Sequence, residues 1–133
     1  MKLEDYFKNG RFYIWKEVFV IAKAKQSLHD AFAVIQDKNE ITIVIDQVKF
    51  FDEANISNII ETEKNWRLIT FDMILPFGLI GFLAKVSEIL AGKNISIFVI
   101  SAYSTDHILV KEKDLEKTIN QLENLGLKAK YKK

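Results

Sequence analysis

The spacing of apolar residues changes in the second half of the chain at Pro76 and Gly78. Residues 67–74, RLITFDMI, are rich in β-branched and aromatic side chains and predict a strand that ends at these two residues. After them the apolar residues recur at helical spacing, namely Leu79, Phe82, Leu83, Val86 and Leu90. The pattern therefore predicts a helix that begins just after Gly78 and is closed by Gly92.

The alternation of strand and helix continues to the end of the chain. Residues 95–103, ISIFVISAY, predict a strand that is buried on both faces, and residues 108–110 predict another strand. A second helix is indicated by one apolar stripe, Leu115, Ile119, Leu122 and Leu125, with Gly126 just past its end. Residues 127–131 alternate apolar residues with lysine and predict an exposed edge strand. The order is βαββαβ, the α+β ferredoxin-like arrangement, in which two helices cover one face of a four-stranded antiparallel sheet.

The first half carries a weaker version of the same order. Three segments read as strands: residues 13–24, 30–36 and 40–46. The tripeptide DKN at 37–39 predicts a hairpin turn, and residues 50–60 are weakly helical. We therefore expect two subdomains of similar type, a degenerate one at residues 1–64 and a clearer one at residues 65–133.

The bulk composition narrows the class of protein. The chain has 133 residues, 28% of them charged, a net charge of +1 and no cysteine. The charge gives no support for binding to nucleic acid or to an anionic membrane, and the missing cysteine excludes disulfides and thiolate chemistry. The sequence contains neither a signal-peptide pattern nor an apolar run of the roughly 20 residues that a membrane helix needs. These features predict a cytoplasmic protein.

The motifs of common catalytic sites are absent from the sequence. The two histidines, His29 and His107, lie far apart and are expected to be structural or solvent-facing. No zinc-protease, nucleophile-elbow, phosphate-loop or dinucleotide-binding motif occurs, and the carboxylates form no spaced pair. Gly78 and Gly81 match the GxxG spacing of a KH loop, but leucine and isoleucine between them are poor phosphate contacts. The sequence therefore predicts no catalytic residue, no metal site and no cofactor.

Two loops carry the residue types that a zwitterionic ligand requires. The first turn of a helix after Gly78 would offer unpaired amides to a carboxylate, and glycine allows a close approach. The turn SAYSTDH supplies the hydroxyls of Ser101, Ser104 and Thr105 and the charge of Asp106, which suit an ammonium group. The alternative explanation is that both loops are ordinary turns without a ligand.

Specific motifs lie along residues 65–125. The segment FGLIGFLA at 77–84, the segment NISIFVISAYSTDHILVK at 94–111 and the pair DL at 114–115 follow one another in order. The lead-in NWRLITF at 65–71 precedes them. Together they resemble the ACT-domain family, most closely its branch of small tandem-ACT proteins that includes the CASTOR-type arginine sensors.

The resemblance implies two ACT subdomains and a regulatory, amino-acid-binding protein without catalysis. It also implies ligand contacts in the two loops, at Phe77, Gly78, Leu79, Ile80, Ser101, Ala102, Tyr103, Ser104, Thr105 and Asp106. The expected partners are a small-molecule ligand, expected to be an amino acid, and either a second copy of the chain or another protein. The alternative function is a structural or protein-interaction module that has lost ligand binding, with aromatic residues near the N-terminus serving an interface.

Overall fold

The computed structural model describes residues 2–52 and 57–131 and divides the chain into two compact units. Unit 1 consists of residues 1–16 and 67–133, and unit 2 of residues 17–66. Two long strands, β1 (Arg11–Ala24) and β4 (Ile59–Phe71), contribute residues to both units.

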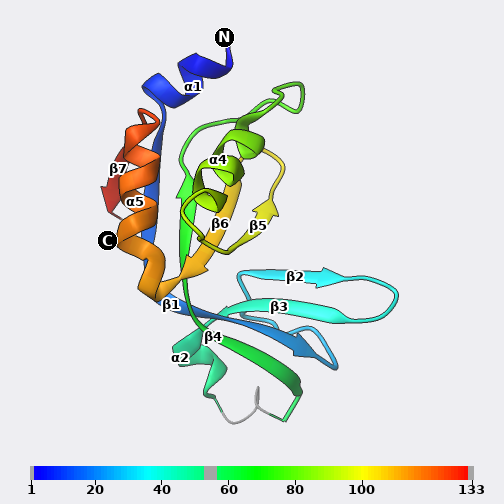
Figure 1. The fold of residues 1–133 in the computed structure, drawn as a ribbon. Helices are drawn as coiled ribbons and strands as arrows, with labels where there is room; N and C mark the ends of the chain where they lie inside the picture. The colour runs from blue at the N-terminus through cyan, green and yellow to red at the C-terminus, as the bar shows by residue number, and fades with distance from the viewer. Residues whose placement is uncertain (1, 53–56, 132–133) are drawn as a thin grey trace. The chain divides into compact units, whose positions relative to one another are not determined.

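Unit 1 has the predicted βαββαβ order, which begins with the end of β4. The elements that follow are α4 (Phe82–Ala91), β5 (Ile97–Ser101), β6 (Asp106–Lys111), the 3-10 turn η1 (Glu112–Asp114), α5 (Leu115–Asn124) and β7 (Lys128–Tyr131). The strand order is β7-β1-β4-β6-β5. Helices α4 and α5 lie together on one face of this sheet (Figure 1). The predicted α+β fold with the βαββαβ order is therefore confirmed, whereas the sheet has β1 as a fifth strand that pairs with β7 in parallel, and so it is not the four-stranded antiparallel sheet that was expected.

The helices of unit 1 bury the apolar stripes that predicted them. In α4 the buried residues are Phe82, Val86 and Leu90, and in α5 Ile119 and Leu122 are almost inaccessible. They pack in one cluster against alternating residues of the sheet, Phe12, Ile14, Ile69, Phe71, Ile108 and Val110. Because side chains alternate across a strand, this cluster identifies the face of the sheet that lies under the helices.

Residues 1–16 belong with the C-terminal residues, which differs from the predicted division at residue 64. A short helix, α1 (Leu3–Asn9), places Phe7 against Phe82, with ring centroids 4.9 Å apart and the rings nearly parallel. Strand β1 lies between β7 and β4 and pairs with β7 in parallel. Phe7 and Phe12 are buried in the unit-1 core, so these N-terminal aromatic residues contribute to packing.

Strand β5 differs from its prediction in burial. It was expected to be buried on both faces, but it is the last strand of the sheet. Val99 is 38% exposed, and Ile97, Phe98 and Ile100 are half-buried. An edge strand packs against one neighbour only, which explains why its apolar run is not fully covered.

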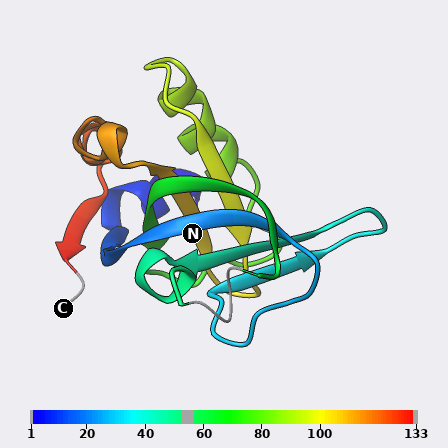
Figure 2. The same ribbon diagram turned by 90° about the horizontal axis from the view of Figure 1, so that it is seen from below.

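Unit 2 contains β2 (Ala33–Gln36) and β3 (Ile41–Asp46) beside β1, in the order β2-β3-β1-β4. Figure 2 shows β2 and β3 as the two arms of a hairpin. The predicted turn at 37–39 is confirmed, because the carboxylate of Asp37 accepts hydrogen bonds from the amides of Asn39 and Glu40. These two bonds also lower the pKa of Asp37.

The structure has a short helix before residues 50–60, where the sequence predicted a weak helix. Helix α2 (Gln47–Phe50) ends where the predicted helix begins, and its first turn is capped by the carboxylate of Asp46, which accepts from the amide of Val48 at 2.9 Å. Ile59 and Ile60 already belong to β4. Residues 53–56 lie outside the described part of the chain. The capping aspartate explains the early start, since an aspartate side chain satisfies the free amides of a first turn.

Candidate functional site

The loop between β4 and α4 is anchored at one side to the β5–β6 hairpin. Leu75 is 9% exposed, and its amide donates to the carbonyl of Ser104 at 2.8 Å. The amide of Leu79 donates to the carbonyl of Pro76 at 3.0 Å and closes a turn within the loop. The loop therefore lies beside the SAYSTDH turn, as the sequence analysis required for a shared ligand site.

The apolar pattern predicted that this helix would begin at Leu79. In the structure helix α4 begins three residues later, at Phe82. Gly81 precedes the helix with φ +96°, a left-handed conformation that a helix cannot contain. The amide of Lys85 is the first to bond within the helix, to the carbonyl of Gly81. In the described part of the chain, the amides of Phe82, Leu83 and Ala84 have no acceptor, and no side chain caps this end.

Replacing Gly81 by alanine is expected to destabilise unit 1 by about 1–2 kcal/mol, because the left-handed conformation places Cβ against the following carbonyl. Apart from its chain neighbours, the added methyl group would meet one described residue, the flexible end of Leu3 at 3.2 Å, so strain in the backbone dominates. Gly78→Ala is the matched control, since no described residue other than its chain neighbours lies within 4 Å of the added carbon. Urea unfolding measures both; equal stabilities of the two variants would contradict the prediction.

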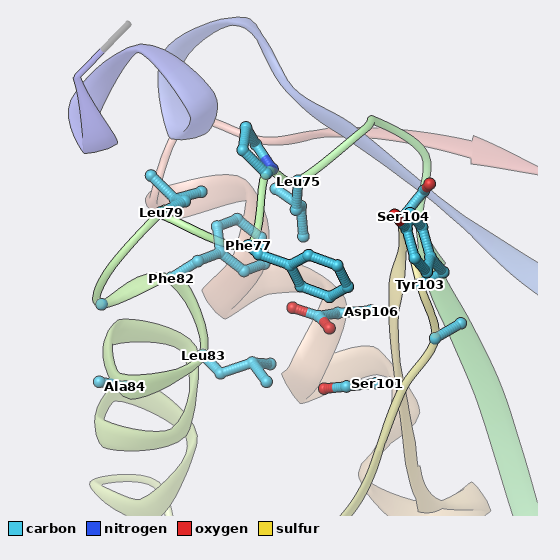
Figure 3. A pocket seen from close by; sticks show the side chains of 13 residues that line it. Leu75, Phe77, Leu79, Phe82, Leu83, Ala84, Ser101, Tyr103, Ser104 and Asp106 are labelled. Atoms are coloured by element: carbon cyan, nitrogen blue, oxygen red, sulfur yellow. The ribbon is translucent and has the colours of Figure 1, made fainter.

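The polar side of the site comes from one pair of residues across the β5–β6 hairpin. Ser101 and Asp106 stand opposite each other in the strand register, and the amide of Ala102 donates to the carbonyl of Thr105 at 2.9 Å. Along β6, Asp106 is two residues before Ile108 and four before Val110, both of which are in the core. Because side chains alternate along a strand, Asp106 lies on the face of the sheet that the helices cover. Figure 3 shows the side chains of Asp106 and Ser101 pointing toward α4.

These segments enclose a pocket of about 270 Å³ within unit 1. It is lined by Leu75, Pro76, Phe77, Leu79, Gly81, Phe82, Leu83, Ala84, Ser101, Ala102, Tyr103, Ser104 and Asp106 (Figure 3). Asp106 carries the one carboxylate among these 13 residues, which include no lysine, arginine or histidine. The start of α4, with its free amides, is therefore opposite a single carboxylate.

Two aromatic rings span the rim of the pocket. Phe77 of the loop and Tyr103 of the hairpin are in edge-to-face contact, with ring centroids 4.8 Å apart. They are 77% and 79% exposed. The contact joins the two walls of the pocket directly and leaves most of both rings open to another molecule.

The structure brings together most of the residues that were singled out from the sequence. Seven of them line the pocket: Phe77, Leu79, Ser101, Ala102, Tyr103, Ser104 and Asp106. Gly78, Ile80 and Thr105 do not line it, and Ile80 is 85% exposed. The sequence did not single out Leu83 and Ala84, although a helix start at Gly81 would have indicated both.

His107 follows Asp106 and points to the opposite face of the sheet, where it is 9% exposed. Its Nδ1 lies 2.8 Å from the hydroxyl of Thr70, and its Nε2 lies 3.4 Å from the hydroxyl of Thr105. Burial lowers the pKa of His107, and the negative charge of Asp106 opposes this effect. The expectation that His107 is structural fits this position.

The stability of unit 1 is expected to fall as the pH decreases below 6.5, the ordinary pKa of histidine. In the unfolded chain His107 takes up a proton near that pH, whereas the folded chain does so only at a lower pH. The unfolded state therefore binds more protons in this interval, and the contribution of neutral His107 to stability is complete above it. Urea unfolding across this range would show the effect; an identical pH dependence in His107→Gln would contradict it.

Features of other kinds of site are missing from the part of the chain that the structure describes. No three histidine or acidic side chains gather in a group that could hold a metal ion there. None of the described helices combines the length and apolarity required to cross a lipid bilayer.

Comparison with known proteins agrees with this architecture. Residues 61–124 match the model of the ACT domain, in its ACT_7 form. The human protein CASTOR3P is 28% identical over 91 residues, which are 63% of this chain, and the chain spans just over half, 56%, of that relative.

Solved structures show the same fold. Protein Atu0741 from Agobacterium tumefaciens has a TM-score of 0.76 and 23% identity, with 93% of this chain and 94% of that chain covered. Protein VC0802 from Vibrio cholerae has a TM-score of 0.75 and 21% identity, with coverage of 94% and 96%. The regulatory subunit of aspartate kinase from Thermus thermophilus has a TM-score of 0.63 and 9% identity, with coverage of 87% and 96%. From the family match and the fold, residues 61–124 form an ACT domain, and the chain is distantly related to CASTOR3P.

Proposed function

We propose that the chain is a regulatory protein without catalytic activity that binds a free amino acid in the unit-1 pocket. The observation that carries the proposal is the placement of the free amides of α4 opposite the carboxylate of Asp106 across a pocket of about 270 Å³. An amino acid carries one group of each charge at a fixed short separation. The two ends of the pocket are complementary to these two groups.

The α-carboxylate is assigned to the start of α4. The amides of Phe82, Leu83 and Ala84 can donate hydrogen bonds, and the positive end of the helix dipole favours an anion. Gly81 leaves this approach without a side chain. The pocket residues at this end contain no acidic group that would compete for the amides.

The ammonium group is assigned to Asp106 and the hydroxyls beside it. None of the ion pairs in the described part of the chain involves Asp106. The hydroxyls of Ser101 and Ser104 can accept further hydrogen bonds from an ammonium group. A charge-assisted bond to a carboxylate is stronger than one between neutral groups.

The side chain of the ligand is assigned to the apolar walls and the aromatic rim. Leu79, Leu83, Phe77 and Tyr103 surround this part of the pocket. A volume of about 270 Å³ is below the range of about 300–1,000 Å³ that is typical for drug-sized ligands. A metabolite of the size of one amino acid fits this volume.

The family supports a regulatory role. ACT domains typically bind small ligands such as amino acids, and the similar chain from Thermus thermophilus is named as the regulatory subunit of an aspartate kinase. We propose that this chain likewise acts in the cytoplasm, on another protein or through a second copy of itself.

Thermal unfolding with each of the twenty amino acids tests the proposal. At one hundred times its dissociation constant, a ligand stabilises the folded state by about 2.7 kcal/mol. We expect one amino acid, or a few with related side chains, to raise Tm, and their N-acetyl and amide derivatives to have little effect. The absence of any shift at millimolar amino acid would contradict the proposal.

A second candidate function is a protein-interaction module. It is favoured by four exposed apolar side chains in the loop and the hairpin, Ile74, Phe77, Ile80 and Tyr103, which are 75–85% exposed. Large contiguous apolar patches on a protein surface are typical of binding sites, and Phe77 and Tyr103 of this set are in direct contact. Sedimentation equilibrium distinguishes the candidates, since self-association that is weakened by Ile80→Lys, together with no amino-acid response, would support the interaction module.

A further inference from the structure

A row of polar side chains crosses the face of the unit-1 sheet that is opposite to the helices. The indole Nε1 of Trp15 on β1 donates to the hydroxyl of Thr70 on β4 at 2.8 Å. The same hydroxyl lies 2.8 Å from Nδ1 of His107 on β6, and Nε2 of His107 lies 3.4 Å from the hydroxyl of Thr105. The row thus connects three neighbouring strands and ends at the turn that forms one wall of the pocket.

The direction of each hydrogen bond follows from the donors available. An indole nitrogen can only donate, so the oxygen of Thr70 accepts from Trp15. Thr70 is 3% exposed, and in the described part of the chain its hydroxyl has these two partners only. Its proton therefore points to Nδ1 of His107, because a buried hydroxyl proton without an acceptor is costly. This leaves the ring proton on Nε2, directed toward Thr105.

The last member of the row is part of the hairpin turn. The carbonyl of Thr105 accepts the amide of Ala102, and the carbonyl of the preceding residue, Ser104, accepts the amide of Leu75 in the opposite wall. Thr105 is therefore directly next to the carbonyl that bonds the hairpin to the loop. The side chain of Thr105 faces the row, which agrees with its absence from the pocket lining.

We infer that Thr70 and His107 are positioning residues: Thr70 fixes the Nε2-protonated tautomer of His107, and His107 holds Thr105 and with it the hairpin wall of the pocket. This inference goes beyond the proposed function, because it concerns the shape of the wall whether or not a ligand is bound. Trp15 aligns the row from its far end.

The tautomer is tested directly in the wild-type protein. Nitrogen-15 NMR of the His107 ring at about pH 8, where the neutral imidazole predominates, distinguishes a protonated Nε2 from a protonated Nδ1. We expect the proton on Nε2. A proton on Nδ1 would overturn the inference, and this outcome does not depend on whether any variant folds.

The effect on the wall is tested with Thr70→Val, which keeps the shape of the side chain and removes the hydroxyl. We expect amide hydrogen exchange of Ala102 and Leu75 to become about tenfold faster, from the loss of one hydrogen bond. Thr70→Ser should restore the wild-type rate and the Nε2 tautomer. Thr118→Val is the matched control, because Thr118 is another buried threonine, bonded to the Asp114 carbonyl instead. Equal exchange at Ala102 and Leu75 in Thr70→Val and Thr118→Val would overturn the inference.

Discussion

Asp106→Asn is expected to weaken amino-acid binding by at least about 30-fold, with the fold retained. The substitution keeps the size of the side chain and removes the only charge among the residues that line the pocket. Removing one member of a desolvated, hydrogen-bonded charge pair costs about 2–5 kcal/mol, and 2 kcal/mol corresponds to about 30-fold in the dissociation constant. Isothermal titration calorimetry with the amino acid that stabilises the wild-type chain measures the change.

The control for this prediction is Asp114→Asn, the same substitution at the start of α5, outside the pocket. It should bind the amino acid as the wild-type chain does. If Asp106→Asn also bound with an unchanged dissociation constant, the assignment of the ammonium group to Asp106 would be wrong. The pocket itself would still be supported in that case if Ala84→Trp, which fills it, abolished the binding.

The second large effect concerns the N-terminal helix. Phe7→Ala is expected to destabilise unit 1 by about 3–5 kcal/mol, the usual cost of deleting a buried phenylalanine. Phe7 is 7% exposed and stacks on Phe82, which in turn contacts Phe71 edge to face at 5.1 Å. The deletion therefore opens a cavity between α1, α4 and the sheet.

The stability of unit 1 must be measured separately from that of unit 2, because the two units can unfold in separate transitions. Native-state hydrogen exchange at the amides of Ile108 and Val110 reports on the core of unit 1. Phe77→Ala, at a phenylalanine that is 77% exposed, is the matched control and should change this stability by less than about 0.5 kcal/mol. A similarly small change in Phe7→Ala would show that Phe7 of helix α1 does not stabilise this unit.

The fold of the second half was predictable because its elements bury continuous apolar stripes. The alternation of helical and strand spacing from residue 67 onward identified the βαββαβ order. The start of α4 was not predictable in the same way, since Leu79 fits the helical stripe. It is the left-handed backbone of Gly81, which no spacing rule detects, that delays the helix to Phe82.

The sequence pattern near the N-terminus could not predict that residues 1–16 belong to unit 1. Helix α1 has only seven residues, and its burial of Phe7 depends on contacts with residues far along the chain. The pairing of β1 with β7 is of the same kind, because nothing in the sequence near Arg11 specifies a partner strand near Lys128. The division at residue 64 assumed instead that neighbouring segments fold together.

The two walls of the pocket could be predicted from their chemistry, but the direction of each side chain could not. The residue types of a zwitterion site pointed to both segments, and the hydrogen bond from Leu75 to Ser104 joins them. Whether Gly78, Ile80 or Thr105 faces the pocket depends on loop geometry. The role of Thr105 on the other face became visible only through its distance to His107.

The parallel pairing of β1 with β7 has a consequence for synthesis on the ribosome. Strand β1 emerges early, but its neighbour β7 is the last strand of the described chain to be translated. Until then one edge of β1 has unpaired backbone groups, and contacts between such distant segments form slowly. During this interval a nascent chain exposes an edge that a chaperone or a second nascent chain can occupy.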